Sequence, residues 1–364
     1  MFVALRDLRH ARGRFALMLV VIALITFLVA FLSSLTAGLA RESTSAVTDL
    51  PVDHLTFTMP AADDGPDFTA STVTSAQRDA WSAAAGVEDV ELLGVATTRA
   101  QSAATTAAVT AFGVEPGSGL LPARTPAPTG GTVTVSRGAA DGMSVAAGDT
   151  VSLGGQDLQV GTVLDVDASY AHTPVVWVAL ADWQAIGAGA PASDEEAVAT
   201  VLAVTGDVDD DTVRRTDAAE GTTTRGVSEA RAAISSFSSE NGSLLTMQAF
   251  LVAISALVVG AFFTVWTISR FGDIAVLKAL GASTRYLLRD AIGQALLILV
   301  IGVGLGTGVA AVGATLLSGL VPVVVTTTTT LVPAAALIAL GLVGAVLAIA
   351  RITTIDPHAA LAAR

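Results

Sequence analysis

The pattern of apolar and polar positions divides the chain into four long apolar runs and one long mixed stretch. The runs cover residues 15–40, 247–268, 291–320 and 331–350, and none of them contains an ionisable side chain. About 20 apolar residues in a helix cross a bilayer core of roughly 30 Å. The first run is too long for a signal peptide and lacks a small-residue cleavage site after a short apolar core. We therefore predict four transmembrane helices.

The mixed stretch between the first two runs, residues 41–246, predicts a folded α+β domain. "RESTSAVTDL" extends the first span as a helical stalk, and "VDHLTFTM" alternates like a strand. "SAQRDAWSAAAG" predicts a short helix capped by Ser75 and ended by Gly86. In residues 131–166, β-branched runs are broken by Gly-Asp and Gly-Gly turns, which predicts a small β-rich unit. "VSEARAAISSFSSENGSLL" predicts a helix that leads into the second span.

Charge predicts the orientation of the spans. Residues 1–14 carry a net charge of +3, residues 269–290 carry +2 and the tail 351–364 carries +1, whereas the whole chain carries −13. Residues 41–246 must therefore hold −19. Because positively charged loops stay in the cytoplasm, we expect both termini inside and the acidic domain outside.

The predicted fold class is a membrane α-helical protein of four transmembrane helices with an α+β extracellular domain between the first and the second. The predicted order is an amphipathic cytoplasmic helix (1–14), the first span (15–40), the extracellular domain with its stalks (41–246), the second span (247–268), a cytoplasmic loop (269–290), the third span (291–320), a short outer loop (321–330), the fourth span (331–350) and a cytoplasmic tail (351–364). A mean hydropathy of +0.67 agrees with this mixture of membrane and aqueous parts.

A search for catalytic motifs finds none. The chain has no cysteine, and its single lysine, Lys278, follows Leu277, so a phosphate-binding G-x-x-x-x-G-K-[ST] loop is absent. H-E-x-x-H, G-x-S-x-G and EF-hand patterns are also absent, and the four histidines are scattered. We expect no enzyme activity, no intrinsic cofactor, no metal site and no nucleic-acid partner in this chain.

The run "GVGLGTG" in the third span superficially suggests a dinucleotide-binding loop, but it lies inside an apolar span. Its glycines predict instead that another helix approaches closely. They are Gly302, Gly304, Gly306 and Gly308.

The loop between the second and third spans predicts a short amphipathic helix. Ile274, Leu277 and Leu280 share one helical stripe, with Asp273 and Lys278 outside it. Gly281 is suited to end this helix, and Ser283 or Thr284 to start the next one. Such a helix either lies among lipid headgroups or docks a cytoplasmic partner.

These residues carry a resemblance to a known family. "SRFGDIAVLKALGAST", followed by a span with Gln294 near its start, resembles the R-x-x-E-I-x-x-L-[KR]-A-x-G-A-S pattern of FtsX-like, or MacB-type, ABC transporter permeases, with Asp273 in place of the family's glutamate. "LRDLRHARGRF" and "ITTIDPHAALAAR" resemble the family's opening and closing segments. The resemblance implies a permease of the bacterial cell membrane whose cytoplasmic loop, Asp273 to Gly281, grips a separate ATPase subunit that binds ATP-Mg. It also implies a complex of two permeases and two ATPases.

The layout of the whole chain resembles the DevC/HrtB haem-exporter branch of that family, which implies haem as the transported ligand. A haem slot needs axial ligands and apolar, membrane-accessible walls. The candidate ligands are Glu42 and Met247, and the candidate walls, brought together in a homodimer, are Phe27, Phe31 and Phe250. His54 is a rival ligand. A solvated flank for Glu42 and simple packing for Met247 are the plain alternatives.

Two other functions remain open at this point. The same fold is compatible with export of a lipoprotein, a lipid, a peptide or an antibiotic. It is also compatible with a non-transporting membrane scaffold that activates an extracellular cell-wall hydrolase.

Overall fold

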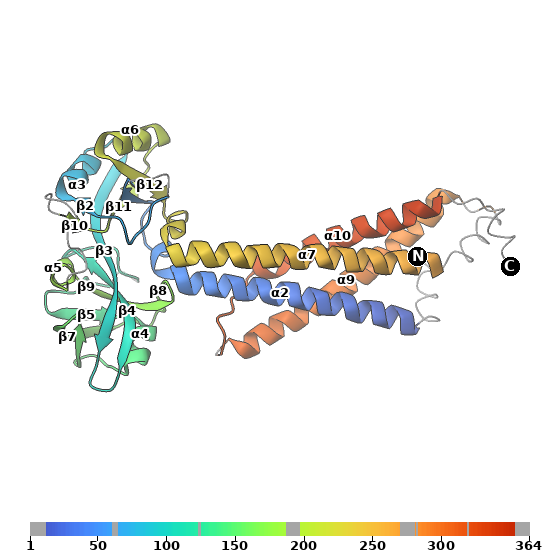
Figure 1. Ribbon diagram of the computed structural model, residues 1–364, viewed down its shortest axis with the longest axis horizontal. Coiled ribbons are helices and arrows are strands. Elements are labelled where there is room, and N and C mark those ends of the chain that lie inside the picture. Colours follow the sequence, from blue (N-terminus) through green and yellow to red (C-terminus); the bar gives the residue numbers. More distant parts are fainter. Residues whose placement is uncertain are drawn as a thin grey trace. The chain divides into compact units, whose positions relative to one another are not determined.

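The computed structural model describes residues 12–59, 65–122, 125–186, 197–269, 281, 283–318 and 320–353. The chain divides into two compact units: a helical unit (Met1–Gly38 with Gly242–Arg364) and a strand-rich unit (Leu39–Asn241). Helices α2 (Arg12–Thr48) and α7 (Ser235–Ser269) each contribute residues to both units. Figure 1 shows the order of the elements along the chain.

Four helices are long and apolar enough to cross a membrane, which confirms the four spans predicted from the sequence. They are α2, α7, α9 (Thr284–Leu317) and α10 (Thr327–Thr353), so one precedes the strand-rich unit and three follow it. Large apolar side chains remain exposed on them, such as Leu257 at 74% and Leu316 at 78%. Exposed apolar surface on this scale suits contact with lipid. Which side of the membrane the termini occupy stays a prediction.

Glycine allows close helix contacts inside the helical unit. A Cβ atom on Gly306 of α9 would lie 2.4 Å from the carbonyl oxygen of Ala23 on α2, and one on Gly302 would lie 2.7 Å from Cγ2 of Ile22. Gly304 and Gly308 have no such neighbour within 4 Å. The predicted close approach is therefore confirmed for one pair of glycines, spaced four residues apart on one face of α9, and the other pair meets no helix among the described residues of this chain.

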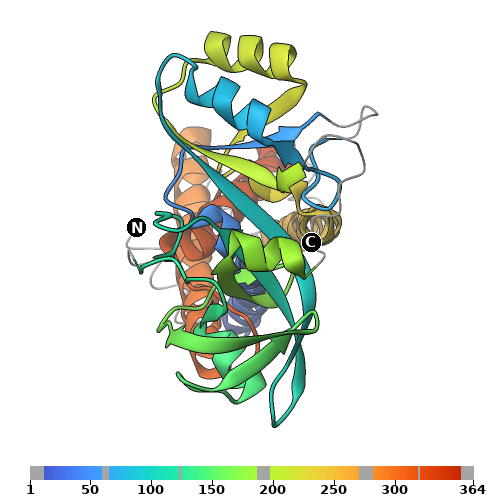
Figure 2. The same ribbon diagram turned by 90° about the vertical axis from the view of Figure 1, so that its left-hand side faces the viewer.

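The strand-rich unit is organised by one long strand, β3 (Val87–Gln101), which crosses it diagonally in Figure 2. The remaining strands are β1 (His54–Thr58), β2 (Val73–Thr74), β4 (Thr106–Val114), β5 (Thr132–Val135), β6 (Thr150–Leu153), β7 (Gln156–Val163), β8 (Ser169–Tyr170), β9 (Thr173–Ala179), β10 (Ala197–Ala199), β11 (Val201–Gly206) and β12 (Thr222–Gly226). The main sheet runs β12-β1-β11-β3-β4-β9-β5-β7-β6, and β6 pairs back onto β3 at Ala100 and Gln101. Six strands from β3 to β6 therefore form a closed ring, which leaves no open edge between them.

Each half of β3 serves a different part of this unit. Its first residues, Val87–Leu93, pair with β11, and Leu93–Gln101 pair with β4. Around the first half lie helices α3 (Ser75–Ser82) and α6 (Asp210–Glu220), side by side in Figure 2. Around the second half lie α4 (Arg137–Met143) and α5 (Leu180–Ala185). The short helix Ala230–Ala233 then leads into α7.

A tryptophan fills a pit formed by two glycines in neighbouring strands. Gly94 of β3 and Gly113 of β4 are directly paired. A Cβ atom at either position would lie within 2.5 Å of Trp183 on α5, which is only 2% exposed. Since only glycine leaves room for the indole ring at both positions, this pair fixes where α5 sits on the sheet.

The structure refines several predicted elements of this unit. The strand in "VDHLTFTM", the β-rich stretch after residue 131 and both helical stalks are confirmed. The predicted Ser75 cap is wrong: Thr74 caps α3, because its hydroxyl accepts from Gln77 N and the Gln77 side chain accepts from Thr74 N in return. The β-rich stretch also contains one helix that the pattern missed, α4, capped by Ser136.

Candidate functional site

The predicted ATPase-coupling residues fall mostly outside the described residues. Asp273, Ile274, Leu277, Lys278 and Leu280 all lie there. Gly281 is described, and its φ of +94° is a backbone conformation that glycine favours. Of the two caps predicted for α9, Ser283 is the one used, with its hydroxyl accepting a hydrogen bond from the backbone N–H of Tyr286.

The predicted substrate residues of the membrane helices lie on α2 and α7. Phe27 and Phe31 stack on each other, with ring centroids 5.7 Å apart and an interplanar angle of 21°. On α7, Met247 is 53% exposed and Phe250 is 66% exposed. The two helices are joined near these residues by a hydrogen bond from the Gln248 amide to the Ser33 hydroxyl.

Glu42, the other predicted haem ligand, belongs to the strand-rich unit and faces a histidine there. His172 lies in the turn between β8 and β9. Its Nε2 atom is 2.7 Å from Glu240 Oε2 of α7, and its Nδ1 atom is 3.9 Å from Glu42 Oε2 of α2. The three side chains are 31–51% exposed. His172 therefore connects the ends of both helices that enter this unit.

The turn that carries His172 is itself tied to α2. The backbone N–H of Ala171 donates to the Ser43 carbonyl at 2.9 Å, and the backbone N–H of Ser169 donates to the Ser45 hydroxyl at 3.0 Å. Ala171 and His172 have φ values of +47° and +63°, a region that residues with a side chain rarely occupy. The surrounding contacts hold the turn in this strained conformation.

This arrangement is a cross-link rather than a metal site. The two carboxylates face opposite nitrogens of one imidazole ring, so a single ion cannot be bound by all three groups. Among the described residues, no group of three metal-ligating side chains is close enough to hold a metal ion. The sequence offered no signal for this cluster, because its members lie 130 and 68 positions apart.

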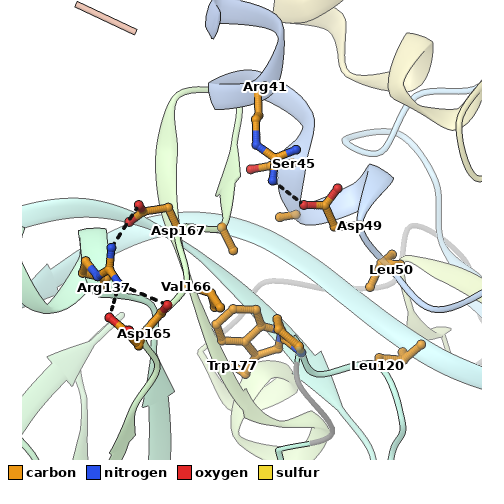
Figure 3. A pocket seen from close by; sticks show the side chains of 13 residues that line it. Arg41, Ser45, Asp49, Leu50, Leu120, Arg137, Asp165, Val166, Asp167 and Trp177 are labelled. Carbon is orange, nitrogen blue, oxygen red and sulfur yellow. Dashed lines mark hydrogen bonds and ion pairs between the residues drawn. The ribbon is translucent and has the colours of Figure 1, made fainter. Parts of the chain in front are cut away.

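A second group of polar residues surrounds a cavity of about 390 Å³ in the same unit (Figure 3). One wall is α2, and the opposite wall is the segment Asp165–Ala168 with Arg137. Arg41 pairs with Asp49 at 2.9 Å, and Arg137 pairs with Asp165 and, at 3.9 Å, with Asp167. The hydrogen bond from Arg137 to the Asp165 carboxylate raises the pKa of Arg137, which keeps this guanidinium charged. The sequence analysis did not single out any of these residues.

Comparison with known proteins identifies the carboxy-terminal part of the chain. Residues 245–357 match the family model described as FtsX-like permease C-terminal. A protein named as a hemin transport system permease, HrtB, from Staphylococcus haemolyticus (strain JCSC1435) is 30% identical over 128 residues, which cover 35% of this chain and 36% of that protein. Its namesake from Staphylococcus epidermidis (strain ATCC 35984) is 31% identical over 128 residues, 35% of this chain and 37% of that protein. The aligned part is thus little more than a third of these relatives.

Two solved structures are similar to part of the chain. The extracellular domain of the noncanonic ABC-type transporter YknZ from Gram-positive bacteria has a TM-score of 0.34 at 17% identity, over 48% of this chain and 98% of that one. The periplasmic region of MacB from Actinobacillus actinomycetemcomitans has a TM-score of 0.35 at 9% identity, over 52% of this chain and 95% of that one. The family model, by contrast, covers α7 from Leu245 onward, α9 and α10, together with the loop whose motif resembles the same family. Residues 245–357 are therefore similar to the carboxy-terminal domain of FtsX-like permeases, and they include three of the four helices that are long and apolar enough to cross a membrane.

Proposed function

We propose that this chain is the permease subunit of an ABC-type efflux pump that works with a separate ATPase subunit. The observation that carries the proposal is the match of residues 245–357 to the FtsX-like permeases. The motif "SRFGDIAVLKALGAST" lies within that match, between two helices able to span a membrane. The chain has no phosphate-binding loop of its own, so ATP-Mg would be bound by the partner subunit.

In this proposal the loop of residues 269–290 docks the ATPase. Asp273 and Lys278 pair with opposite charges in a groove of the partner, and Ile274, Leu277 and Leu280 fill that groove. A closed ATPase dimer favours one arrangement of two copies of this chain, so ATP binding shifts their conformational equilibrium.

Co-purification with an ABC ATPase subunit that is co-expressed with this chain tests the docking. We expect Leu277→Asp to abolish retention of the ATPase, because a carboxylate would be buried in an apolar groove. Leu320→Asp is the matched control, since Leu320 is 83% exposed and lies beyond the carboxyl end of α9. Equal ATPase retention by both variants would show that the loop is not the docking element.

We propose haem as the transported substrate, exported from the outer leaflet of the bacterial membrane. The support is the name of the HrtB relatives and the chemistry of the candidate residues. Glu42 offers a half-exposed carboxylate and Met247 a half-exposed thioether. Phe27, Phe31 and Phe250 supply apolar walls. In a homodimer, two copies of each would line one lateral slot.

Haem titration of the purified complex, followed by its Soret band, tests this assignment. We expect Glu42→Gln and Met247→Leu to shift or weaken the band, because each removes a ligand atom while keeping the side-chain size. Glu240→Gln is the control for the carboxylate, since Glu240 also faces His172. Met59→Leu is the control for the thioether, since Met59 is 50% exposed.

The outcomes separate the competing functions. A band that is unchanged in both ligand variants rejects Glu42 and Met247 as haem ligands. A complex that retains its ATPase but binds no haem favours another cargo, such as a lipid, a peptide or an antibiotic. A chain that retains no ATPase favours the scaffold function.

A further inference from the structure

The two-residue loop between β8 and β9 has an unusual sequence for its backbone conformation. Ala171 and His172 both have positive φ values, +47° and +63°. Two-residue hairpin loops with positive φ at both positions favour Asn-Gly, Asp-Gly or Gly-Gly. A residue that its surroundings hold in such a conformation indicates a function for its side chain. The histidine at position 172 therefore has a reason that the turn itself does not supply.

Both the backbone and the ring of this histidine are held in place beside α2. The backbone N–H of Ala171 donates to the Ser43 carbonyl at 2.9 Å. The Nε2 atom of His172 lies 2.7 Å from Glu240 Oε2. The opposite edge of the ring is thereby directed at α2, with Nδ1 at 3.9 Å from Glu42 Oε2.

The Glu42 carboxylate takes part in no other ion pair or hydrogen bond within the part of the chain that the structure describes. Its side chain is 51% exposed. A glutamate in this setting has several rotamers, and fixing it when a ligand binds costs conformational entropy. When both ring nitrogens of His172 carry a proton, one N–H faces Glu240 and the other faces Glu42. At 3.9 Å the ring attracts the carboxylate without forming a hydrogen bond that would occupy its oxygen.

We propose that His172 is a positioning residue for the Glu42 carboxylate when this carboxylate ligates haem iron. The inference rests on the proposed function, in which Glu42 is an axial ligand. The imidazole restricts the carboxylate before haem binds, so less ordering is required at binding. Partners of this kind behind a metal ligand raise metal affinity roughly 10–100-fold. Exposed ion pairs in general contribute little, but this one is set by a loop that is strained and anchored on two sides.

Haem titration of the full-length chain in lipid nanodiscs, followed by the Soret band, tests the proposal with matched variants. His172→Gly removes the ring and adopts the positive φ without strain. We expect it to weaken haem binding about tenfold. His172→Asn keeps an N–H donor at the position of Nδ1 and also tolerates positive φ, so it should bind haem as tightly as the wild type. Because Asn has no counterpart of Nε2, its binding also shows that the contact with Glu240 is not the cause.

His172→Asp is the matched partner of His172→Asn. The two side chains have the same shape, but Asp presents a carboxylate that repels Glu42. We expect His172→Asp to bind haem at least as weakly as His172→Gly. This comparison stands even if His172→Gly fails to fold, and equal haem affinity of the Asn and Asp variants would overturn the inference.

A double-mutant cycle shows whether His172 acts through Glu42. In a Glu42→Gln background the ligating carboxylate is gone, so His172→Gly should cause no further loss of haem affinity. An equal loss in both backgrounds would show that His172 acts elsewhere, and the inference would be wrong.

The wild-type titration separates this inference from the function on which it rests. If the wild-type chain binds no haem, the haem assignment fails and the inference fails with it. If the wild type binds haem and a folded His172→Gly variant binds it equally tightly, the inference alone fails.

Discussion

Replacing Gly306 with alanine tests whether α2 and α9 touch through their backbones. The new Cβ atom would lie 2.4 Å from the Ala23 carbonyl oxygen and 2.6 Å from the Cβ atom of Thr26. Ordinary Cβ contacts begin at 3.4 Å, so the two helices must separate by about 1 Å at this point. Neither obstacle is the far end of a flexible side chain. A change of rotamer therefore cannot relieve the clash.

The size of the effect follows from two opposing terms. Overfilling a packed interior costs about 1–3 kcal/mol, whereas alanine favours a helix over glycine by up to about 1 kcal/mol. We expect Gly306→Ala to lower the free energy of unfolding by about 1–2 kcal/mol. Gly304→Ala, which meets no atom within 4 Å, keeps only the gain. Gly302→Ala is expected to lie between them, because its new Cβ atom would meet Cγ2 of Ile22 at 2.7 Å, a side-chain contact rather than a backbone one.

Thermal denaturation of the purified chain in detergent, followed by loss of the monodisperse species, measures this order. For a chain of 364 residues, 1 kcal/mol corresponds to a shift of about 1–2 °C. Gly306→Ala should therefore melt about 1–4 °C below the wild type, and Gly304→Ala should melt at or above it. Equal melting of these two variants would show that α2 and α9 do not meet at Gly306.

Three further predictions concern the strand-rich unit. Gly94→Ala should destabilise the chain by about 1–3 kcal/mol, and by less in a Trp183→Leu background, where the indole ring no longer fills the pit. A double-mutant cycle of thermal unfolding measures this difference. If the two effects are additive, residues 94 and 183 are not in contact. His172→Ala should speed hydrogen exchange in Ser235–Asn241. His172→Gly should melt higher than His172→Ala by the equivalent of about 1 kcal/mol, because glycine adopts the positive φ at this position without strain. If His172→Ala melts higher instead, the backbone at residue 172 is not strained. Hydrogen bonds from Thr212 lower the pKa of Asp209, the cap of α6. The stability that this carboxylate contributes is therefore present above the ordinary aspartate pKa of about 3.9 and is lost as the pH falls through the lower pKa of the folded state. If Asp209→Asn leaves the acid unfolding curve unchanged, this prediction is wrong.

The elements that follow from local pattern were predictable. Four apolar runs became four helices, and the alternation at "VDHLTFTM" became β1, because length and periodicity depend on neighbouring residues alone. The cap of α3 was assigned one residue late. Thr74 and Ser75 are both good caps, and only the position of Gln77, three residues after Thr74, distinguishes them.

The contacts between distant segments were not predictable from one sequence. The pairing of β6 with β3 closes the strand ring across about 50 positions, and Trp183 fills a pit about 70 positions from Gly113. For the same reason, Glu42 was selected by its place beside a span, while its partner His172 gave no signal. The cavity beside Trp177 gathers residues from five separate segments, so no local motif marks it.

The glycine run of α9 predicts a close helix contact but does not determine which of its glycines make that contact. "GVGLGTG" contains two pairs with a spacing of four residues, Gly302 with Gly306 and Gly304 with Gly308. Successive residues of a helix are about 100° apart, so the two pairs lie on nearly opposite faces, and either satisfies the small-xxx-small pattern. The choice between them depends on which face bears residues that suit a neighbour. Here α2 brings the backbone carbonyl of Ala23 and the Cβ atom of Thr26 against Gly306, so the backbones of the two helices meet at this level. A glycine motif in one helix therefore identifies the contacting face only when the residues of the facing helix are considered together with it.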